Sequence, residues 1–171
     1  EKKPNLILKG SKIKFNKIEF KYEATEEQAI KGVSFSIDGN SMAAFVGHSG
    51  AGKSTIINLL PRFYDPQRGS IEIDGQNIKN VSLNSLRKNL SLVSQDVILF
   101  DDTIKNNIAY AKNNASQEDI SRACKFAAAE EFIEKLPDGY NTLIGENGIR
   151  LSGGQKQRIS IARAILKESP I

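Results

Sequence analysis

The chain has very few of several residue types, and each shortage excludes a class of protein. Its only cysteine is Cys124, so no disulfide can form within the chain, and a reducing compartment is the expected environment. Its only histidine is His48. No apolar run approaches the roughly 18 residues that span a bilayer, and residues 1–5 lack the apolar core of a signal peptide. These shortages exclude the class of secreted disulfide-rich mini-proteins and predict a soluble chain.

The rest of the composition is ordinary for one globular domain. The 171 residues are 39% apolar and 26% charged. The 24 basic and 20 acidic side chains give a formal net charge of +4, which suits an anionic ligand without identifying one. We find no internal repeat and no low-complexity linker in the sequence.

Apolar periodicity predicts strands and helices along the whole chain. Strands are expected over 12–20, 33–37, 42–46, 71–73 and 90–93, with the run 42–46 fully buried. Helices are expected over 54–60, 83–89, most of 103–136, and 153–167. Strands that flank helices, together with a helical insert, predict an α/β core that carries a helical subdomain.

The strongest motif is a glycine-rich loop between an expected strand and an expected helix, with the sequence Gly47-His48-Ser49-Gly50-Ala51-Gly52-Lys53-Ser54. Its glycines let successive backbone N–H groups point at phosphate oxygens, and the helix N-terminus adds partial positive charge. Lys53 would reach the β and γ phosphates of a nucleotide, and Ser54 would ligate Mg²⁺. The alternative, a glycine-rich turn beside a surface lysine, does not explain the strand–loop–helix context.

A second motif has the sequence Leu151-Ser152-Gly153-Gly154-Gln155. Ser152 can cap the last helix, and the two glycines free backbone N–H groups for an anion. An ordinary capped helix would explain the serine but not the whole string.

Together the two motifs resemble those of the nucleotide-binding domain of ATP-binding cassette (ABC) proteins, and the resemblance extends over essentially the whole chain. It implies an α/β P-loop NTPase (RecA-like) core with an antiparallel β subdomain and an inserted α-helical subdomain. The implied single domain 1–171 divides into an ATP-binding core with the β subdomain at about 1–95, a helical subdomain at about 96–155, and a return to the core at 156–171. In this family the string Leu151–Gln155 is the signature motif, which contacts ATP held by a second nucleotide-binding domain in a head-to-tail dimer.

The resemblance also assigns roles to single residues. Tyr22 matches the aromatic residue that stacks on adenine, although by itself it would more often be a core aromatic. Thr55 is expected to bond the α phosphate. Gln95 matches the catalytic-site glutamine that links Mg²⁺ and water to the transmembrane partner, so Ser54 and Gln95 are the implied metal ligands and ATP and Mg²⁺ the implied cofactors.

Two loops point to a subgroup of exporters. Residues 106–111 and 145–148 look most like those of bacterial lipid A and multidrug exporters, although Asn147 stands where many exporters have arginine. The resemblance therefore implies an ATPase motor domain that drives transport of lipid or hydrophobic substrates. It further implies a transmembrane-domain partner and a place on the cytoplasmic face of the inner membrane.

Two elements of this family, the Walker B strand and the switch histidine, are missing from the sequence. The family places its Walker B strand, with the Mg²⁺-linked aspartate and the catalytic glutamate, immediately beyond Ile171. The switch histidine is missing too, because His48 lies in the phosphate loop. We therefore expect a C-terminally truncated fragment that binds ATP poorly and hydrolyses it hardly at all.

Other classes of function fit less well. A non-catalytic nucleotide-binding or interaction module is the main alternative. Chromosome-maintenance ATPases share a related signature and bind DNA, but they need a long coiled coil between Gln95 and Leu151, where we find no heptads. No nucleic-acid partner is therefore expected. ATP is preferred to GTP because the sequence has no Asn-Lys-x-Asp motif.

Overall fold

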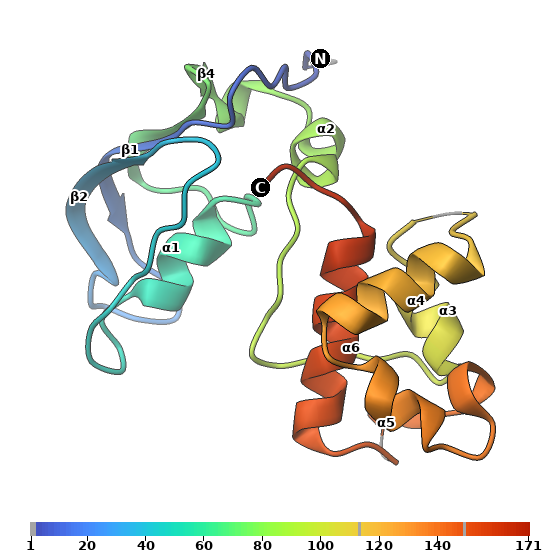
Figure 1. Cartoon of the computed structure of the whole chain (residues 1–171). Helices are drawn as coiled ribbons and strands as arrows, with labels where there is room; N and C mark the ends of the chain where they lie inside the picture. The colour runs from blue at the N-terminus through green and yellow to red at the C-terminus, as the bar shows by residue number, and fades with distance from the viewer. Residues whose placement is uncertain (1–2, 113, 149) are drawn as a thin grey trace. The chain divides into compact units, whose positions relative to one another are not determined.

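The computed structural model describes residues 3–112, 114–148 and 150–171. The chain forms two compact units (Figure 1). The first, which we call the sheet unit, extends to Leu90 and includes Pro170–Ile171, and the second, the helical unit, covers Ser91–Ser169. The subdomain bounds implied by the resemblance, near residues 95 and 155, stay a prediction.

The sheet unit contains one antiparallel sheet with the strand order β2-β1-β3-β4. Its elements are β1 (Ile13–Phe20), β2 (Ile30–Ile37), α1 (Lys53–Leu59), β3 (Arg68–Ile73), β4 (Gln76–Asn77), the 3₁₀ turn η1 (Ile78–Asn80) and α2 (Leu83–Lys88). The expected strands 12–20, 33–37 and 71–73 and the helices 54–60 and 83–89 are confirmed to within three residues at their ends.

One face of the sheet packs into an apolar core. Phe15, Ile18 and Phe20 of β1 are buried in one core cluster, and a register shift between Phe15 and Ile18 interrupts the alternation of the strand. The Phe15 ring stacks on that of Phe35 in β2 with centroids 4.5 Å apart. Leu59 of α1 belongs to the same core cluster, so the helix that follows the glycine-rich loop is held by apolar contacts.

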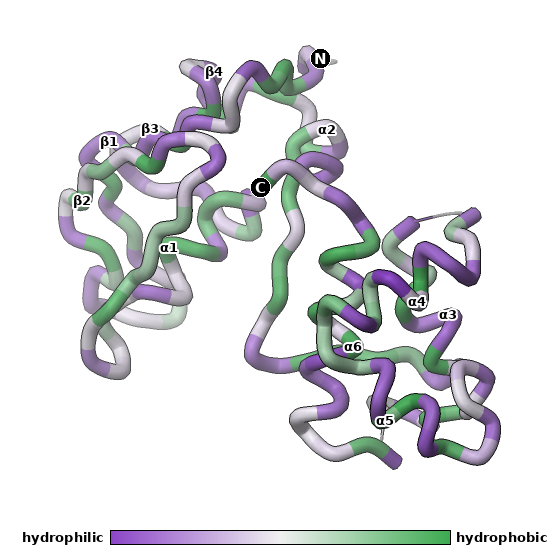
Figure 2. The backbone as a smooth tube through the Cα atoms, in the orientation of Figure 1, coloured by the Kyte–Doolittle hydropathy of each residue, from purple (hydrophilic) through white to green (hydrophobic). Residues whose placement is uncertain are grey.

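The expectation of a buried strand over 42–46 is wrong for this structure. No strand is assigned there, and Met42 and Val46 are 98% and 91% exposed. Figure 2 shows apolar residues along the segment that connects β2 to α1. A strand forms only where a neighbour accepts its backbone hydrogen bonds, and among the described residues nothing pairs with this segment. Only Phe45 packs inward, edge-to-face on Phe35.

The expected strand 90–93 is absent for the same reason. Within the described ranges no strand is assigned after β4, and Leu92 and Val93 are about one-third exposed, at 38% and 36%. The antiparallel sheet of the sheet unit is therefore the only sheet among the described residues.

The helical unit confirms the helices expected after residue 103. It contains α3 (Ile104–Ala109), α4 (Gln117–Phe126), α5 (Glu130–Glu134), the 3₁₀ turns η2 (Gly139–Asn141) and η3 (Glu146–Gly148), and α6 (Gly153–Leu166). Their apolar faces form a second core that includes Ile120 and Ile159. Ser116 and Asp119 form a capping box at the start of α4. In the described part of the chain, no helix has the length and apolarity needed to cross a membrane.

Candidate functional site

The glycine-rich loop of the sheet unit lies in front of α1 and is exposed to solvent from Gly47 to Ala51. A turn closes it, in which the Ala51 N–H donates to the carbonyl of His48 at 3.2 Å. Gly52 has a φ of +84°, and a Cβ there would lie 2.7 Å from the carbonyl oxygen of Ala29. Only glycine fits this position without strain, so the glycine is required by the backbone path into α1.

Lys53, the first residue of α1, folds back over the loop. Its Nζ donates to the carbonyl oxygens of Gly47 at 2.9 Å and His48 at 2.7 Å. The hydroxyl of the next residue, Ser54, lies on an exposed side chain. A cation and a hydroxyl therefore stand beside exposed backbone, which is the chemistry that phosphate and a phosphate-bound cation need.

Tyr22 and Thr55 are brought together although they are distant in the sequence. Thr55 is buried, at 6% exposure, and its Oγ1 lies 3.0 Å from the Tyr22 hydroxyl. The predicted base-stacking residue and the predicted α-phosphate residue are thus in direct contact.

The Tyr22 ring belongs to an aromatic cluster with Phe20 and Tyr64. Its centroid lies 4.8 Å from that of Phe20 and 5.2 Å from that of Tyr64, both in edge-to-face geometry. Tyr22 and Tyr64 also line a cavity of about 470 Å³. Sequence reasoning missed Tyr64, because no local pattern connects it to Tyr22.

The other predicted site residues lie in the helical unit. Gln95 is exposed in the irregular segment that precedes α3. In the second motif, Leu151 is buried, at 8% exposure, and Ser152 is the N-cap of α6. The Ser152 hydroxyl accepts the N–H of Gln155 at 3.3 Å, and Gln155 Oε1 accepts the N–H of Ser152 at 2.9 Å.

The two glycines of the second motif stand clear of the rest of the chain. Gly153 and Gly154 are exposed, and a Cβ built on either meets no atom within 4 Å. Within the described residues the start of α6 is therefore satisfied by its own capping box and is open to solvent at its glycines.

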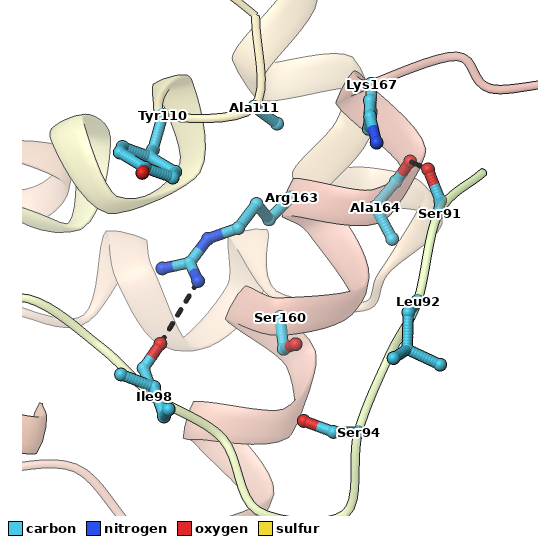
Figure 3. Close-up of a pocket in the computed structure, with 10 residues that line it drawn as sticks. All are labelled: Ser91, Leu92, Ser94, Ile98, Tyr110, Ala111, Ser160, Arg163, Ala164 and Lys167. Atoms are coloured by element: carbon cyan, nitrogen blue, oxygen red, sulfur yellow. Dashed lines mark hydrogen bonds between the residues drawn. The ribbon is translucent and has the colours of Figure 1, made fainter. Parts of the chain in front are cut away.

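The helical unit also has a hollow of about 360 Å³ (Figure 3). Arg163 of α6 reaches across it, where its guanidinium donates to the carbonyl of Ile98 at 3.1 Å and to that of Asn107 at 2.8 Å. Burial lowers the pKa of Arg163. Because its N–H groups hold backbone oxygens, this arginine braces the segment from Ile98 to Asn107. Ile98 and Tyr110 at the rim are 68% and 69% exposed.

The residues present fit the nucleotide better than they fit a metal ion alone. Among the described residues, no three His, Cys, Asp or Glu side chains gather to hold a metal. The sheet unit offers only the Ser54 hydroxyl of the two predicted metal ligands, because Gln95 belongs to the other unit. Mg²⁺ keeps several waters and binds through substrate phosphates, so one protein hydroxyl agrees with a phosphate-bound ion.

Comparison with known proteins decides the family. The family model described as ABC transporter matches residues 30–171. The chain belongs to the ABC transporter family. It is 55% identical, over all of its length, to the ATP-dependent lipid A-core flippase of Legionella pneumophila (strain Lens), and 52% identical over 93% of its length to ABC transporter B family member 21 of Arabidopsis thaliana.

A solved structure of this family gives the same result for the fold. The structure of a bacterial Atm1-family ABC exporter with ATP bound matches 99% of the chain with a TM-score of 0.95 and 47% identity. The expected fold class and the resemblance to lipid A exporters are thereby confirmed. The chain spans 29% of the length of the Legionella flippase, 12% of the Arabidopsis protein and 30% of the Atm1-family chain.

Proposed function

We propose that this chain is the ATP-binding motor domain of an ABC exporter and that the glycine-rich loop with Lys53 binds the phosphates of MgATP. The observation that carries the proposal is the position of Lys53 Nζ over the exposed loop, within 2.9 Å of two loop carbonyls. The flexible stem of lysine lets the ammonium move from these carbonyls to phosphate oxygens. The likeness to an exporter whose structure has ATP bound supports the same site.

Each of the other residues has a separate task in this proposal. The backbone N–H groups from His48 to Gly52 and the first turn of α1 hold the phosphates, and the Tyr22 ring stacks on the adenine. The Ser54 hydroxyl binds Mg²⁺, with Gln95 as the second protein ligand. Mg²⁺, when bound, neutralises charge on the phosphates.

The partners follow from the helical unit. The open glycines Gly153 and Gly154, together with Leu151, Ser152 and Gln155, would face the nucleotide of a second nucleotide-binding domain in a head-to-tail dimer. The hollow beside Ser94, rimmed by Ile98 and Tyr110, would receive a segment of the exporter's transmembrane domain.

The whole protein would couple ATP hydrolysis to export of lipid or hydrophobic substrates. The flippase relatives support lipid A-like molecules, because their names specify lipid A-core. In this proposal the domain stands at the cytoplasmic face of the inner membrane.

The largest expected effect is that of Lys53→Ala on nucleotide binding. The variant loses two or more charge-assisted hydrogen bonds to phosphate, so its affinity for MgATP should fall by about 10-fold to 100-fold. Affinity is measured by following backbone amide NMR signals of the ¹⁵N-labelled chain, a method that also detects weak binding.

Lys31→Ala is the matched control, because Lys31 is an exposed lysine of β2 outside the loop. It should bind MgATP as the unaltered chain does. Equal binding by Lys53→Ala and the unaltered chain would contradict the proposal.

A further inference from the structure

The hydrogen bond between Tyr22 and Thr55 gives Tyr22 a second task besides stacking. The two hydroxyl oxygens are 3.0 Å apart, across 33 residues of sequence. A threonine within a helix often bonds the carbonyl of the preceding turn. In the described part of the chain the Thr55 hydroxyl makes no such bond, and its one hydrogen bond is to Tyr22. Its direction is therefore set by Tyr22.

The direction of this bond follows from counting protons. A threonine hydroxyl has one proton and two lone pairs. If Thr55 is to donate to a phosphate oxygen, its single proton is committed, and it can only accept from Tyr22. The phenol of Tyr22 is the more acidic group of the two and hence the better donor. Tyr22 then donates to Thr55, and Thr55 donates onward.

The hydrogen bond from Tyr22 to Thr55 strengthens the hydrogen bond from Thr55 to phosphate. A hydroxyl that accepts a hydrogen bond is polarised and becomes a better donor itself. Thr55 is 6% exposed, so little water competes for its hydroxyl. It is the third residue of α1, in the turn whose backbone N–H groups also point toward the helix N-terminus. The Thr55 hydroxyl is thus a further hydrogen-bond donor beside those backbone N–H groups.

We propose that the Tyr22 hydroxyl is a positioning group for phosphate: it donates to Thr55 Oγ1 and so holds the Thr55 proton toward a phosphate oxygen of the nucleotide. The inference rests on the proposed function, because it concerns the same site. In this proposal the ring of Tyr22 stacks on the base, and its hydroxyl acts on the phosphate through Thr55.

A merely structural bond would give a different pattern. If the hydroxyl only fixed the ring, its removal would weaken the binding of adenine-containing ligands alone. If it acts through Thr55, its removal weakens the binding of a phosphate chain that has no base. Inorganic tripolyphosphate with Mg²⁺ is therefore the probe, and adenosine is the comparison ligand.

The test uses NMR titrations of the chain and of the variants Tyr22→Phe, Thr55→Val and Thr55→Ser, with Tyr22→Phe also combined with each threonine variant. Tyr22→Phe keeps the ring and removes one neutral hydrogen bond, so affinity for tripolyphosphate should fall by about 3-fold to 10-fold while adenosine affinity stays unchanged. In the Thr55→Val background, Tyr22→Phe should have no further effect. Thr55→Ser restores the acceptor, so the Tyr22→Phe effect should return there.

Tyr140→Phe serves as the control, since it removes a tyrosine hydroxyl from the helical unit. It should leave tripolyphosphate affinity unchanged. The inference is overturned if Tyr22→Phe binds tripolyphosphate as the unaltered chain does, or if its effect persists with Thr55→Val. If Lys53→Ala binds tripolyphosphate as well as the unaltered chain, the proposed function itself fails, and the inference fails with it.

Discussion

Two helices of this chain begin with glycine-bearing motifs, and they begin in opposite ways. α1 follows Gly52, whose left-handed backbone leads into the helix with no side-chain cap. α6 follows Ser152, whose side chain forms a complete capping box with Gln155. The first helix start depends on glycine geometry and has no side-chain cap for its N–H groups, whereas the second is stabilised by its own side chains. Similar glycine content thus serves two different physical purposes.

Gly52→Ala should break the α1 start and gives the largest effect on stability. The new Cβ would meet the Ala29 carbonyl oxygen and Ile30 Cδ1, each at 2.7 Å, at a φ of +84°. We expect the free energy of unfolding to fall by about 2–4 kcal/mol, as measured by urea unfolding of the sheet unit.

Gly50→Ala is the matched control, with a φ of +81° and no atom within 4 Å of its Cβ. Its free energy of unfolding should fall by only about 1 kcal/mol, because alanine is strained at a positive φ but its Cβ meets no other atom. Equal losses in the two variants would show that the close approach to Ala29 is unimportant.

Ser152→Ala should weaken the α6 start by removing its cap. The free energy of unfolding of the helical unit should fall by about 1 kcal/mol. The loss is measured as a decrease in the thermal midpoint, monitored by circular dichroism. Ser152→Thr keeps a hydroxyl and should recover most of the loss. An unchanged midpoint in Ser152→Ala would mean that the capping box does not stabilise α6.

The helical unit should also lose stability in alkali through Cys124. Burial raises the pKa of this thiol to about 11, with a smaller contribution from the charge of Glu130. Because the folded pKa lies above that of the unfolded chain, the stabilisation is complete below about pH 9 and is lost as the pH rises toward 11. Because of this thiol, the free energy of unfolding measured in urea should be about 1 kcal/mol lower at pH 10 than at pH 7.

The Cys124→Ala variant separates the thiol from other groups that titrate in alkali. Its stability should fall less between these two pH values than that of the unaltered chain. The same slope in both proteins would rule out the thiol as the cause.

Gly154→Ala gives the smallest effect and one of opposite sign to Gly52→Ala. Gly154 lies in the first turn of α6 with open space around its Cβ position, so alanine should stabilise the helix by about 0.5 kcal/mol. The thermal midpoint of the helical unit should rise slightly. A fall would mean that glycine is required by the helix itself rather than by a ligand or partner.

Local patterns in the sequence predicted most of the elements. The apolar periodicity of the strand 12–20 and the helix cap Ser152 are short-range signals, and the structure confirms both of them. These signals depend on residues within a few positions of one another, so a single sequence contains them in full.

Features that need distant partners could not be predicted in the same way. The run 42–46 has the apolarity of a buried strand, but strand formation depends on a neighbour, and among the described residues it has none. The bond between Tyr22 and Thr55 and the contact between Tyr22 and Tyr64 join residues far apart in the sequence. The glycine-rich loop was identifiable because all of its residues are consecutive.

Hydrogen–deuterium exchange of the backbone amides, with and without MgATP, tests the contrast between the two helix starts most directly. The experiment is run at a protein concentration where the chain is monomeric. Nucleotide should slow exchange over residues 47–56 and leave exchange over residues 152–156 unchanged. Slower exchange at the start of α6 alone, or no change over 47–56, would contradict this contrast.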